Sequence, residues 1–397
     1  MSLTTATATT AGQRKPIRIW VDGCYDVMHH GHFNALRQAK AMGDIVVAGV
    51  HSDAELLLHK GPTVMNENER MAAVAACKWV DEVVPNAPYS TSLEWMDKYN
   101  CDYCVHGDDP STLADGTDSY KYVKAQGRYL ECKRTKGVST TDLVNRMLLM
   151  TTLQQQEQDQ GQGDRAVGDI DGGRTNSSRP EQQQQQQKKQ QQHEVLSTAR
   201  KISIFSRGNR DLQKGDRVIY VDGTFDLLHV GHIEFLKRAK ARGDYLVVGV
   251  YDDATVRAIK GSAHHPLMSM HERVLALLAC RHVDDVVLSA PYHLTEHVLD
   301  GDYTIHEVVR GSHHPHRQPR TTTTDQETNV ENDPYQLAKE RGIFVQLDEP
   351  AHEVTTRSII HRIVKQRTMY EDRQRKRALK EAAAAAAVTV SAKPLEQ

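Results

Sequence analysis

The sequence lacks any apolar run near the roughly 20 residues that a membrane-spanning helix needs. Its first residues, Met1 to Pro16, contain no apolar segment of the kind found in secretory signals. Six cysteines in 397 residues are too few for a disulfide scaffold, which favours reduced thiols. These absences predict a soluble, cytoplasmic protein without a stable membrane anchor.

Excess charge of either sign is also missing, because 50 Lys and Arg face 52 Asp and Glu, a net charge of −2. This balance disfavours nucleic acid as a partner. Neither a Walker A nor a GxGxxG pattern occurs, which excludes the commonest ATPase and dehydrogenase classes. The hydrophobic content of 39% is low for one compact globule of this length, so part of the chain is expected to be disordered.

What the sequence does contain is an internal duplication. Residues 21–61 align without a gap to residues 221–261, with close to half of the positions identical. The similarity resumes between residues 69–89 and 272–292. This spacing is far longer than a solenoid repeat and indicates a duplicated domain.

Polar segments separate and follow the two copies. Residues 152–193 are rich in Gln and poor in apolar side chains, so they cannot offset their ordering entropy and are predicted to be a tether. From Arg367 onward the tail is charged and then contains a run of alanines, Ala382–Ala387. The expected boundaries are a disordered N-terminus (1–15), a first domain (16–150), a linker (151–215), a second domain (216–366, with a polar insert at 312–333) and a tail (367–397).

Within each copy, strand patterns alternate with helical patterns. Asp44–Val50 is a nearly continuous apolar run, typical of a strand covered on both faces. His32–Met42 carries apolar residues at helical spacing. Such alternation predicts βαβ units in a parallel sheet, with ligands at the carboxyl ends of the strands. The other expected strands are Ile17–Val21, Val80–Val84 and Tyr103–His106, and the other expected helices begin at Ser52/Asp53 or cover Glu69–Trp79 and Ser92–Tyr99.

The first strand runs into a turn that contains His29 and His32, with Gly31 between them. Histidines three residues apart at a helix start lie on one side of its first turn, where free N–H groups attract phosphate. They can donate hydrogen bonds to phosphate oxygens as charge develops. Helix capping and metal binding are the alternatives, but the same pattern recurs at His229 and His232, which favours the phosphate hypothesis.

Two further features match a phosphate-binding site. Lys60-Gly61 and Lys260-Gly261 recur at the same offset from the histidines and are candidates for a cation that closes on a polyphosphate, although such lysines are usually just solvated. The segment from Arg134 to Asp142 places cations, a glycine and hydroxyls before an apolar helical run. It could be an ordinary N-cap, but a cap does not require the cations or the glycine, so we expect a second phosphate cradle.

These motifs resemble those of the cytidylyltransferases in the nucleotidyltransferase superfamily. The family's HxGH turn is His29-His30-Gly31-His32 here, and its RTxGxST stretch spans Arg134 to Thr140. The two-copy layout with a linker is similar to that of the ethanolamine-phosphate members. The resemblance implies an α/β fold: two tandem Rossmann-like nucleotidyltransferase domains with parallel sheets, joined by a disordered Gln-rich linker.

The resemblance also implies the reaction CTP + phosphoethanolamine → CDP-ethanolamine + diphosphate, a step of phosphatidylethanolamine synthesis. Magnesium would accompany CTP, and no organic cofactor is expected. The partners would be CTP and phosphoethanolamine, with a homodimer and a peripheral location at the endoplasmic reticulum left open.

Site residues follow by position from the family's motifs, while the metal ligands stay unassigned. The catalytic residues would be His29, His32, Lys60 and Arg134. Nucleotide in the first copy would contact Cys24, Tyr25, His106, Gly107, Asp108, Lys136, Gly137, Ser139, Thr140 and Thr141. Nucleotide in the second copy would contact Thr224, Phe225, His229, His232, Lys260, Arg310, Gly311, Thr355 and Thr356. The substrate ammonium would meet Tyr89 and Asp109.

Two alternatives remain at this point. Choline-phosphate enzymes resemble the first copy closely, but residues 106–111 lack the tyrosine expected for a quaternary-ammonium cage. The chain could also sense nucleotide without turnover. Between the copies, the second retains Thr355 and Thr356 but has Glu353 in its late cradle, which would repel a triphosphate. We therefore expect the first copy to be catalytic.

Overall fold

A computed structural model describes residues 14–109, 117–161, 196–260, 266–311, 333–348 and 354–372, together with Arg375 and Leu379. Most of the expected N-terminal segment and tail, the centre of the expected linker, nearly all of the insert, Gly261 and Glu353 lie outside these residues. Among the described residues, no helix has the length and apolar character needed to cross a membrane.

The first copy folds into a five-stranded parallel sheet with the strand order β3-β2-β1-β4-β5. Because consecutive strands run outward from β1 and the chain then returns to β4, the order switches between β1 and β4, where ligands bind in such sheets. The strands are β1 (Arg18–Gly23), β2 (Ile45–His51), β3 (Glu82–Ala87), β4 (Tyr103–Gly107) and β5 (Tyr129–Cys132). The helices are α1 (His30–Met42), α2 (Asp53–His59), α3 (Glu67–Ala75), α4 (Leu93–Lys98), α5 (Lys121–Ala125) and α6 (Thr140–Gly161).

The second copy repeats this topology in a separate sheet, in the order β10-β9-β6-β7-β8. Its central strand β6 corresponds to β1, so each copy has its own switch point. The strands are β6 (Val218–Gly223), β7 (Tyr245–Val250), β8 (Asp285–Leu288), β9 (Ile305–Gly311) and β10 (Phe344–Leu347). The helices are α8 (Val230–Lys240), α9 (Asp253–Lys260), α10 (Met270–Leu278), α11 (Glu296–Asp300), α12 (Gln336–Glu340) and α13 (Thr356–Lys365).

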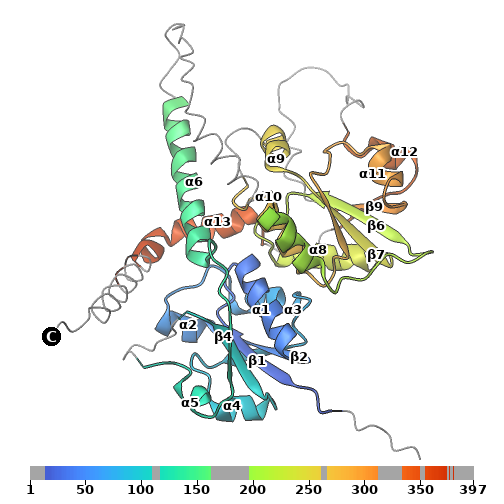
Figure 1. The fold of residues 1–397 in the computed structure, drawn as a ribbon. Helices are drawn as coiled ribbons and strands as arrows, with labels where there is room; N and C mark the ends of the chain where they lie inside the picture. Colours follow the sequence, from blue (N-terminus) through green and yellow to red (C-terminus); the bar gives the residue numbers. More distant parts are fainter. Residues whose placement is uncertain are drawn as a thin grey trace, which may run out of the picture.

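The central strands are buried as their sequences predict. Val46, Val47, Ala48 and Val50 of β2 are all 1% exposed or less, because helices cover both faces of the sheet. The prediction of two tandem parallel-sheet domains is confirmed (Figure 1).

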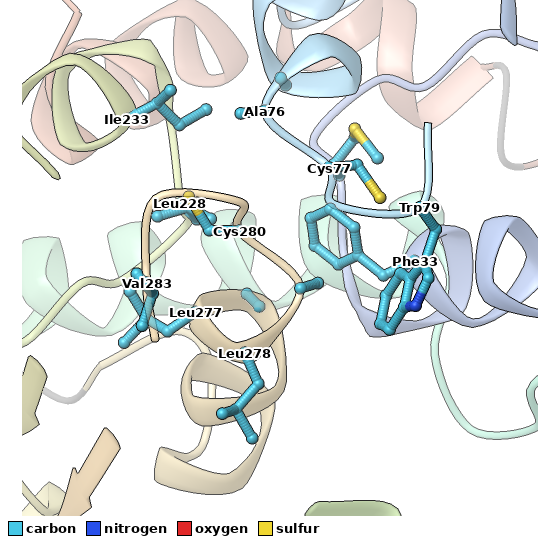
Figure 2. Close-up of a cluster of buried hydrophobic side chains, with 14 of the residues drawn as sticks. Phe33, Ala76, Cys77, Trp79, Leu228, Ile233, Leu277, Leu278, Cys280 and Val283 are labelled. Carbon is cyan, nitrogen blue, oxygen red and sulfur yellow. The ribbon is translucent and has the colours of Figure 1, made fainter. Parts of the chain in front are cut away.

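The two copies share one continuous apolar cluster. Phe33 and Trp79 of the first copy lie opposite Leu277 and Leu278 of the second (Figure 2). An isolated antiparallel bridge pairs Cys77 with Cys280, two residues that occupy equivalent positions in the duplicated sequence. The backbone hydrogen bonds beside it join Lys78 N to Ala279 O (2.9 Å) and Arg281 N to Ala76 O (2.8 Å). The two halves therefore contact each other through equivalent surfaces, in an approximately two-fold arrangement.

Both ends of the expected linker carry regular structure. Helix α6 continues to Gly161. At the other end, residues 196–206 form a helix whose Phe205 ring meets the Trp79 ring edge-to-face, at a centroid distance of 5.2 Å. The Lys78 ammonium also donates to the Phe205 carbonyl at 2.6 Å. This helix therefore packs on the first copy, whereas the composition of the linker predicts only a tether.

Candidate active site

The histidine turn follows β1 through a tight change of direction. Tyr25 and Val27 have φ angles of 51° and 45°, in the left-handed region that non-glycine residues rarely adopt. The turn delivers His29 as the N-cap of α1, with only 5% of the residue exposed. Backbone strain of this kind concentrates at functional sites, where the surrounding structure holds it in place.

Hydrogen bonds with the backbone fix the orientation of both imidazoles. Gly31 N donates to His29 Nδ1 at 3.1 Å, and His29 N donates to His32 Nδ1 at 3.4 Å. The ring centroids lie 4.1 Å apart. Because each Nδ1 accepts, the proton of each neutral ring is assigned to Nε2. The capping alternative is thus realised by Nδ1, while Nε2–H stays available as a donor.

Burial keeps both rings neutral at physiological pH. It lowers the pKa of His29 well below its ordinary value, with the neighbouring His32 contributing next. Burial also lowers the pKa of His32 to about 4, assisted by the charge of Lys60. Two neutral Nε2–H donors therefore stand side by side at the helix N-terminus, which is suited to phosphate oxygens.

Gly31 is required because the late cradle lies directly against the turn. A Cβ at this position would stand 2.9 Å from atoms of the His29 ring and 3.1 Å from Val138 Cγ1. Thr140, at the start of α6, donates its hydroxyl to the Asp26 carbonyl at 3.0 Å. The two motifs, more than 100 residues apart in the sequence, are thus joined by packing and by a hydrogen bond.

Within the cradle, the hydroxyls and the cations have different surroundings. Ser139 Oγ accepts from Asp142 N (3.1 Å) and donates to Asp142 Oδ2 (2.6 Å), so the N-cap alternative also holds. Gly137 has φ +81°, which favours glycine, and Lys136 is exposed. Thr141 is the second residue of the helix α6 that follows Ser139. The cap accounts for Ser139 but not for the exposed Lys136.

Arg134 bridges the cradle to the end of β4. Its guanidinium donates to Asp109 Oδ2 at 2.7 Å, and its backbone N donates to Asp108 Oδ1 at 2.8 Å. This backbone hydrogen bond is the main cause that lowers the pKa of Asp108. Gly107 and His106 precede them, and the His106 ring lies 4.7 Å from the Tyr120 ring. The end of β4 and the cradle therefore form one wall at the switch point.

Lys60 and Tyr89 form the opposite wall. Lys60 follows the end of α2 and its ammonium lies 5.4 Å from the centre of the Tyr89 ring. The His59 ring stacks on the same tyrosine at 4.3 Å. Tyr89, predicted to meet the substrate ammonium, thus meets an ammonium of the chain itself in this structure. Tyr25 lies on the histidine side, 5.9 Å from the His32 ring.

Two buried residues that were not among the expected site residues hold the turn in place. Asp26 accepts from the backbone N–H groups of Val64 and Met65, both at 2.9 Å. Arg70, fully buried, donates to the Cys24 carbonyl at 2.8 Å, so it fixes the backbone next to the turn. Both residues are identical in the second copy, as Asp226 and Arg273, and the repeat alignment could have found them.

The second copy has the same histidine turn as the first copy and the same hydrogen bond from a threonine to that turn, but in the described part of the chain it lacks some of the other hydrogen bonds. The His229 and His232 rings stack at 3.8 Å, yet their buried Nδ1 atoms have no hydrogen-bond partner among the described residues. The pKa of His229 is about 4 because of burial. Thr355 caps α13, and Thr356 donates to the Asp226 carbonyl at 3.0 Å.

The remaining expected residues of the second copy also lie around its switch point. The Phe225 ring lies 5.5 Å from His232, and the Thr224 carbonyl accepts from Arg273 at 2.7 Å. Arg310 stacks over Tyr335 at 4.8 Å. Lys260 ends α9, and Gly311 ends β9.

Comparison with known proteins gives the family of this fold and site. The model of the cytidylyltransferase-like family matches residues 20–146 and 220–362. The chain belongs to the cytidylyltransferase-like family.

Relatives within this family match the chain to different extents. It is 46% identical over 372 residues to the ethanolamine-phosphate cytidylyltransferase of Dictyostelium discoideum, covering 94% of this chain and 97% of the relative. It is 44% identical over 384 residues to the ethanolamine-phosphate cytidylyltransferase of Mus musculus, covering 94% of this chain and 92% of the relative. Similarity to choline-phosphate cytidylyltransferase A of Rattus norvegicus is 41% over 136 residues, only 34% of this chain and 37% of the relative.

Proposed function

We propose that this chain is an ethanolamine-phosphate cytidylyltransferase, which converts CTP and phosphoethanolamine into CDP-ethanolamine and diphosphate. The observation that carries this function is the extent of the similarity. Relatives with this activity in their names match both copies over 94% of the chain, whereas the choline-phosphate relative matches 34%.

The geometry of the first site suits an in-line displacement. A phosphate oxygen of phosphoethanolamine forms a bond to the α-phosphorus of CTP, and the bond from that phosphorus to the diphosphate oxygen breaks. No covalent enzyme intermediate is needed, so the protein acts by positioning and charge stabilisation. His29 and His32 donate through Nε2–H to the phosphate oxygens as charge builds up, without transferring a proton.

The cations of the two walls would neutralise the triphosphate. Lys60 and Arg134 are the candidates for this role, with the exposed Lys136 beside them. In the present arrangement Lys60 lies over Tyr89 and Arg134 is paired with Asp109. When CTP draws both cations toward its phosphates, the ring of Tyr89 and the carboxylate of Asp109 become available to the ammonium of phosphoethanolamine. This exchange favours binding of CTP before phosphoethanolamine.

The other expected contacts belong to the nucleotide. We assign Cys24, Tyr25 and the strand-end residues His106, Gly107 and Asp108 to its base and sugar side, because they line the switch point. The cradle residues Gly137, Ser139, Thr140 and Thr141 would offer the N–H groups of the α6 start to phosphate.

Magnesium would arrive bound to CTP. The described residues contain no group of three or more His, Cys, Asp or Glu arranged to hold a metal ion. Asp26, the carboxylate next to the histidine turn, already accepts a backbone hydrogen bond on each oxygen. The residues present therefore do not form a dedicated magnesium site, and the ion would be held through triphosphate oxygens, as is usual for magnesium with nucleotides. We place the enzyme in the cytoplasm, with peripheral association at the endoplasmic reticulum as a further proposal.

A diphosphate-release assay tests the function and separates the alternatives. The purified chain is incubated with CTP, magnesium and one of three acceptors: phosphoethanolamine, phosphocholine or glycerol 3-phosphate. We expect release with phosphoethanolamine and little with the other two. Preference for phosphocholine would make the chain a choline-phosphate enzyme. Nucleotide binding without release for any acceptor would favour a nucleotide sensor.

Matched histidine variants test which copy is catalytic. His29→Ala removes a donor from the first site and is expected to lower kcat about 10²–10³-fold. His229→Ala removes the equivalent residue from the second site and should leave a much larger share of the activity. Undiminished turnover in the His29→Ala protein would contradict the assignment.

A further inference from the structure

Helices α6 and α13 cross between the two halves (Figure 1). Each helix carries an arginine that contacts a residue of the other half. On α13, Arg362 donates to both carboxylate oxygens of Glu69, at 2.6 and 2.9 Å. On α6, Arg146 donates to Glu272 at 2.8 Å. The two glutamates occupy equivalent positions in the repeat, so the contacts are reciprocal.

Each arginine also holds a backbone carbonyl beside the opposite site. Arg362 donates to Val64 O at 3.3 Å, and Arg146 donates to Leu267 O at 3.2 Å. The N–H groups of the same two residues are bound by the aspartates of the histidine turns. Val64 N donates to Asp26 at 2.9 Å, and Leu267 N donates to its counterpart Asp226 at 2.7 Å. The backbone at Val64 and at Leu267 is therefore hydrogen-bonded on both sides. Its N–H group is bound by an aspartate of its own half, and its carbonyl group is bound by an arginine of the other half.

The two helices complete a closed path of contacts. Thr140, the first residue of α6, binds the Asp26 carbonyl, and Thr356, the first residue of α13, binds the Asp226 carbonyl. From Asp26 the path runs through α6 to Arg146 and the second site. From Asp226 it returns through α13 to Arg362 and the first site.

Burial of the two carboxylates makes these pairs more costly to break than surface ion pairs. The side chains of Glu69 and Glu272 are each 9% exposed, while those of Arg362 and Arg146 are 33% and 37% exposed. A largely buried carboxylate loses much of its hydration, so removing its partner leaves an uncompensated charge. An apolar cluster that includes Met147 and Ile363 packs around the crossing and keeps the two helices in register.

We propose that Arg362 is a positioning residue of the first site, supplied by the second half of the chain. This inference rests on the proposed function. Val64 comes shortly after Lys60 and Gly61, so fixing its carbonyl anchors the loop that carries the Lys60 cation. The second copy thereby contributes to catalysis in the first, independently of whether it turns over substrate itself.

Four variants of the full chain test the proposal: Arg362→Ala, Arg362→Lys, Glu69→Gln and the Glu69→Gln/Arg362→Ala double variant. Gln at position 69 preserves the capping box of α3 but removes the charge. We expect Arg362→Ala to raise the KM for CTP about tenfold, within the usual range of coupling between sites. Arg362→Lys should recover only part of the loss, since an ammonium cannot bind a carboxylate in the two-pronged manner of guanidinium.

Arg146→Ala serves as the matched control. It breaks the equivalent contacts with Glu272 and Leu267, which lie beside the second site. Its effect on the KM for CTP should therefore be clearly smaller. An equal effect of Arg146→Ala and Arg362→Ala would indicate a general loss of contact between the halves and would overturn the proposal. So would a KM for CTP within about twofold of the unmodified chain in Arg362→Ala, too small a change for coupling between sites.

The double variant shows whether Arg362 acts through Glu69. If it does, Glu69→Gln/Arg362→Ala should be no worse than Arg362→Ala alone, and additive losses would contradict the proposal. Thermal unfolding of each variant identifies any protein that has not folded, in which case Arg362→Lys and Glu69→Gln carry the test. Calorimetric titration with CTP alone reports binding without turnover. A chain that binds CTP but releases no diphosphate would refute the proposed function, while the affinities of the variants would still decide the role of Arg362.

Discussion

His29 and His32 each combine a structural role in the turn with the chemical role that we propose for them. In each ring, Nδ1 is committed to a backbone N–H of the turn, and this commitment directs the remaining proton to Nε2. Burial then prevents protonation of the ring. A neutral donor of fixed direction needs no rearrangement when charge develops on a phosphate, which is the basis of electrostatic preorganisation.

The buried histidines predict a loss of stability in acid. The pKa values of His30 and His229 are lowered by burial to about 4 from an ordinary value of 6.5. Between these two values the unfolded chain binds more protons than the folded chain, so the free energy of unfolding falls as the pH falls. The loss is about 1.4 kcal/mol per pH unit for each such ring in that window. Urea unfolding near pH 7, 6 and 5 measures it.

His30→Gln removes one of these titrating rings and should flatten the pH dependence. The same substitution at His297, an exposed histidine, is the matched control variant. Constant stability from pH 7 to 5 in the unmodified chain would contradict the assignment of neutral buried histidines.

Among the individual residues, those in short sequence motifs could be predicted, whereas those that pair with residues far away in the sequence could not. The histidines and the cradle stand in short motifs, so their positions could be inferred from the sequence. Arg146 and Arg362 could not, because their glutamate partners lie 126 and 293 residues away and nothing local distinguishes these arginines from solvated ones. The role expected of Tyr89 stays a prediction, since it faces Lys60 here.

At the scale of elements, the helix at residues 196–206 is the main departure from expectation. Its sequence follows a Gln-rich segment, and composition alone gives no sign that it packs on a distant domain. Phe205 is 3% exposed and stands edge-on to Trp79. The contact therefore fixes the start of the second half of the chain against the first copy.

Truncating Phe205 measures what this helix contributes. Phe205→Ala removes a buried aromatic ring and should lower the free energy of unfolding by about 3–5 kcal/mol. Leu212→Ala, at a residue that is 40% exposed, is the matched control and should cost far less. Equal losses in urea unfolding would show that the helix does not pack as described.

The strands and long helices of the first copy were predictable because their periodicities are strong. β2 was expected at Asp44–Val50 and spans Ile45–His51. The helix expected at Glu69–Trp79 is shorter at its C-terminal end, since α3 ends at Ala75. The chain must leave the helix there for Cys77 to pair with Cys280. A pairing between the two copies overrode the local pattern.

At the scale of the whole molecule, the two halves share an apolar cluster, a backbone bridge and two ion pairs between helices. Arg281 of the second half adds hydrogen bonds to the carbonyls of Cys77 (2.9 Å) and Val80 (2.5 Å). This surface resembles a domain core divided between two parts rather than a transient contact. The copies are therefore expected to behave as one cooperative unit.

Cutting the chain between the halves tests this unity. A specific protease site is introduced within residues 162–195, and the protein is cleaved after folding. Because the shared cluster does not depend on the connection, the two fragments should elute together in gel filtration and retain activity. Separation of the fragments under native conditions would show that the contact is weaker than its burial indicates.

The backbone pairing of Cys77 with Cys280 has a consequence for how the enzyme responds to dilution. Subunits that meet through equivalent surfaces come apart as their concentration falls, and a site supported across that surface is lost with them. Here both surfaces belong to one polypeptide. The effective concentration of one surface around the other is therefore set by the connecting chain and not by the protein concentration in solution. Each molecule carries its own supporting partner at a fixed ratio of one to one.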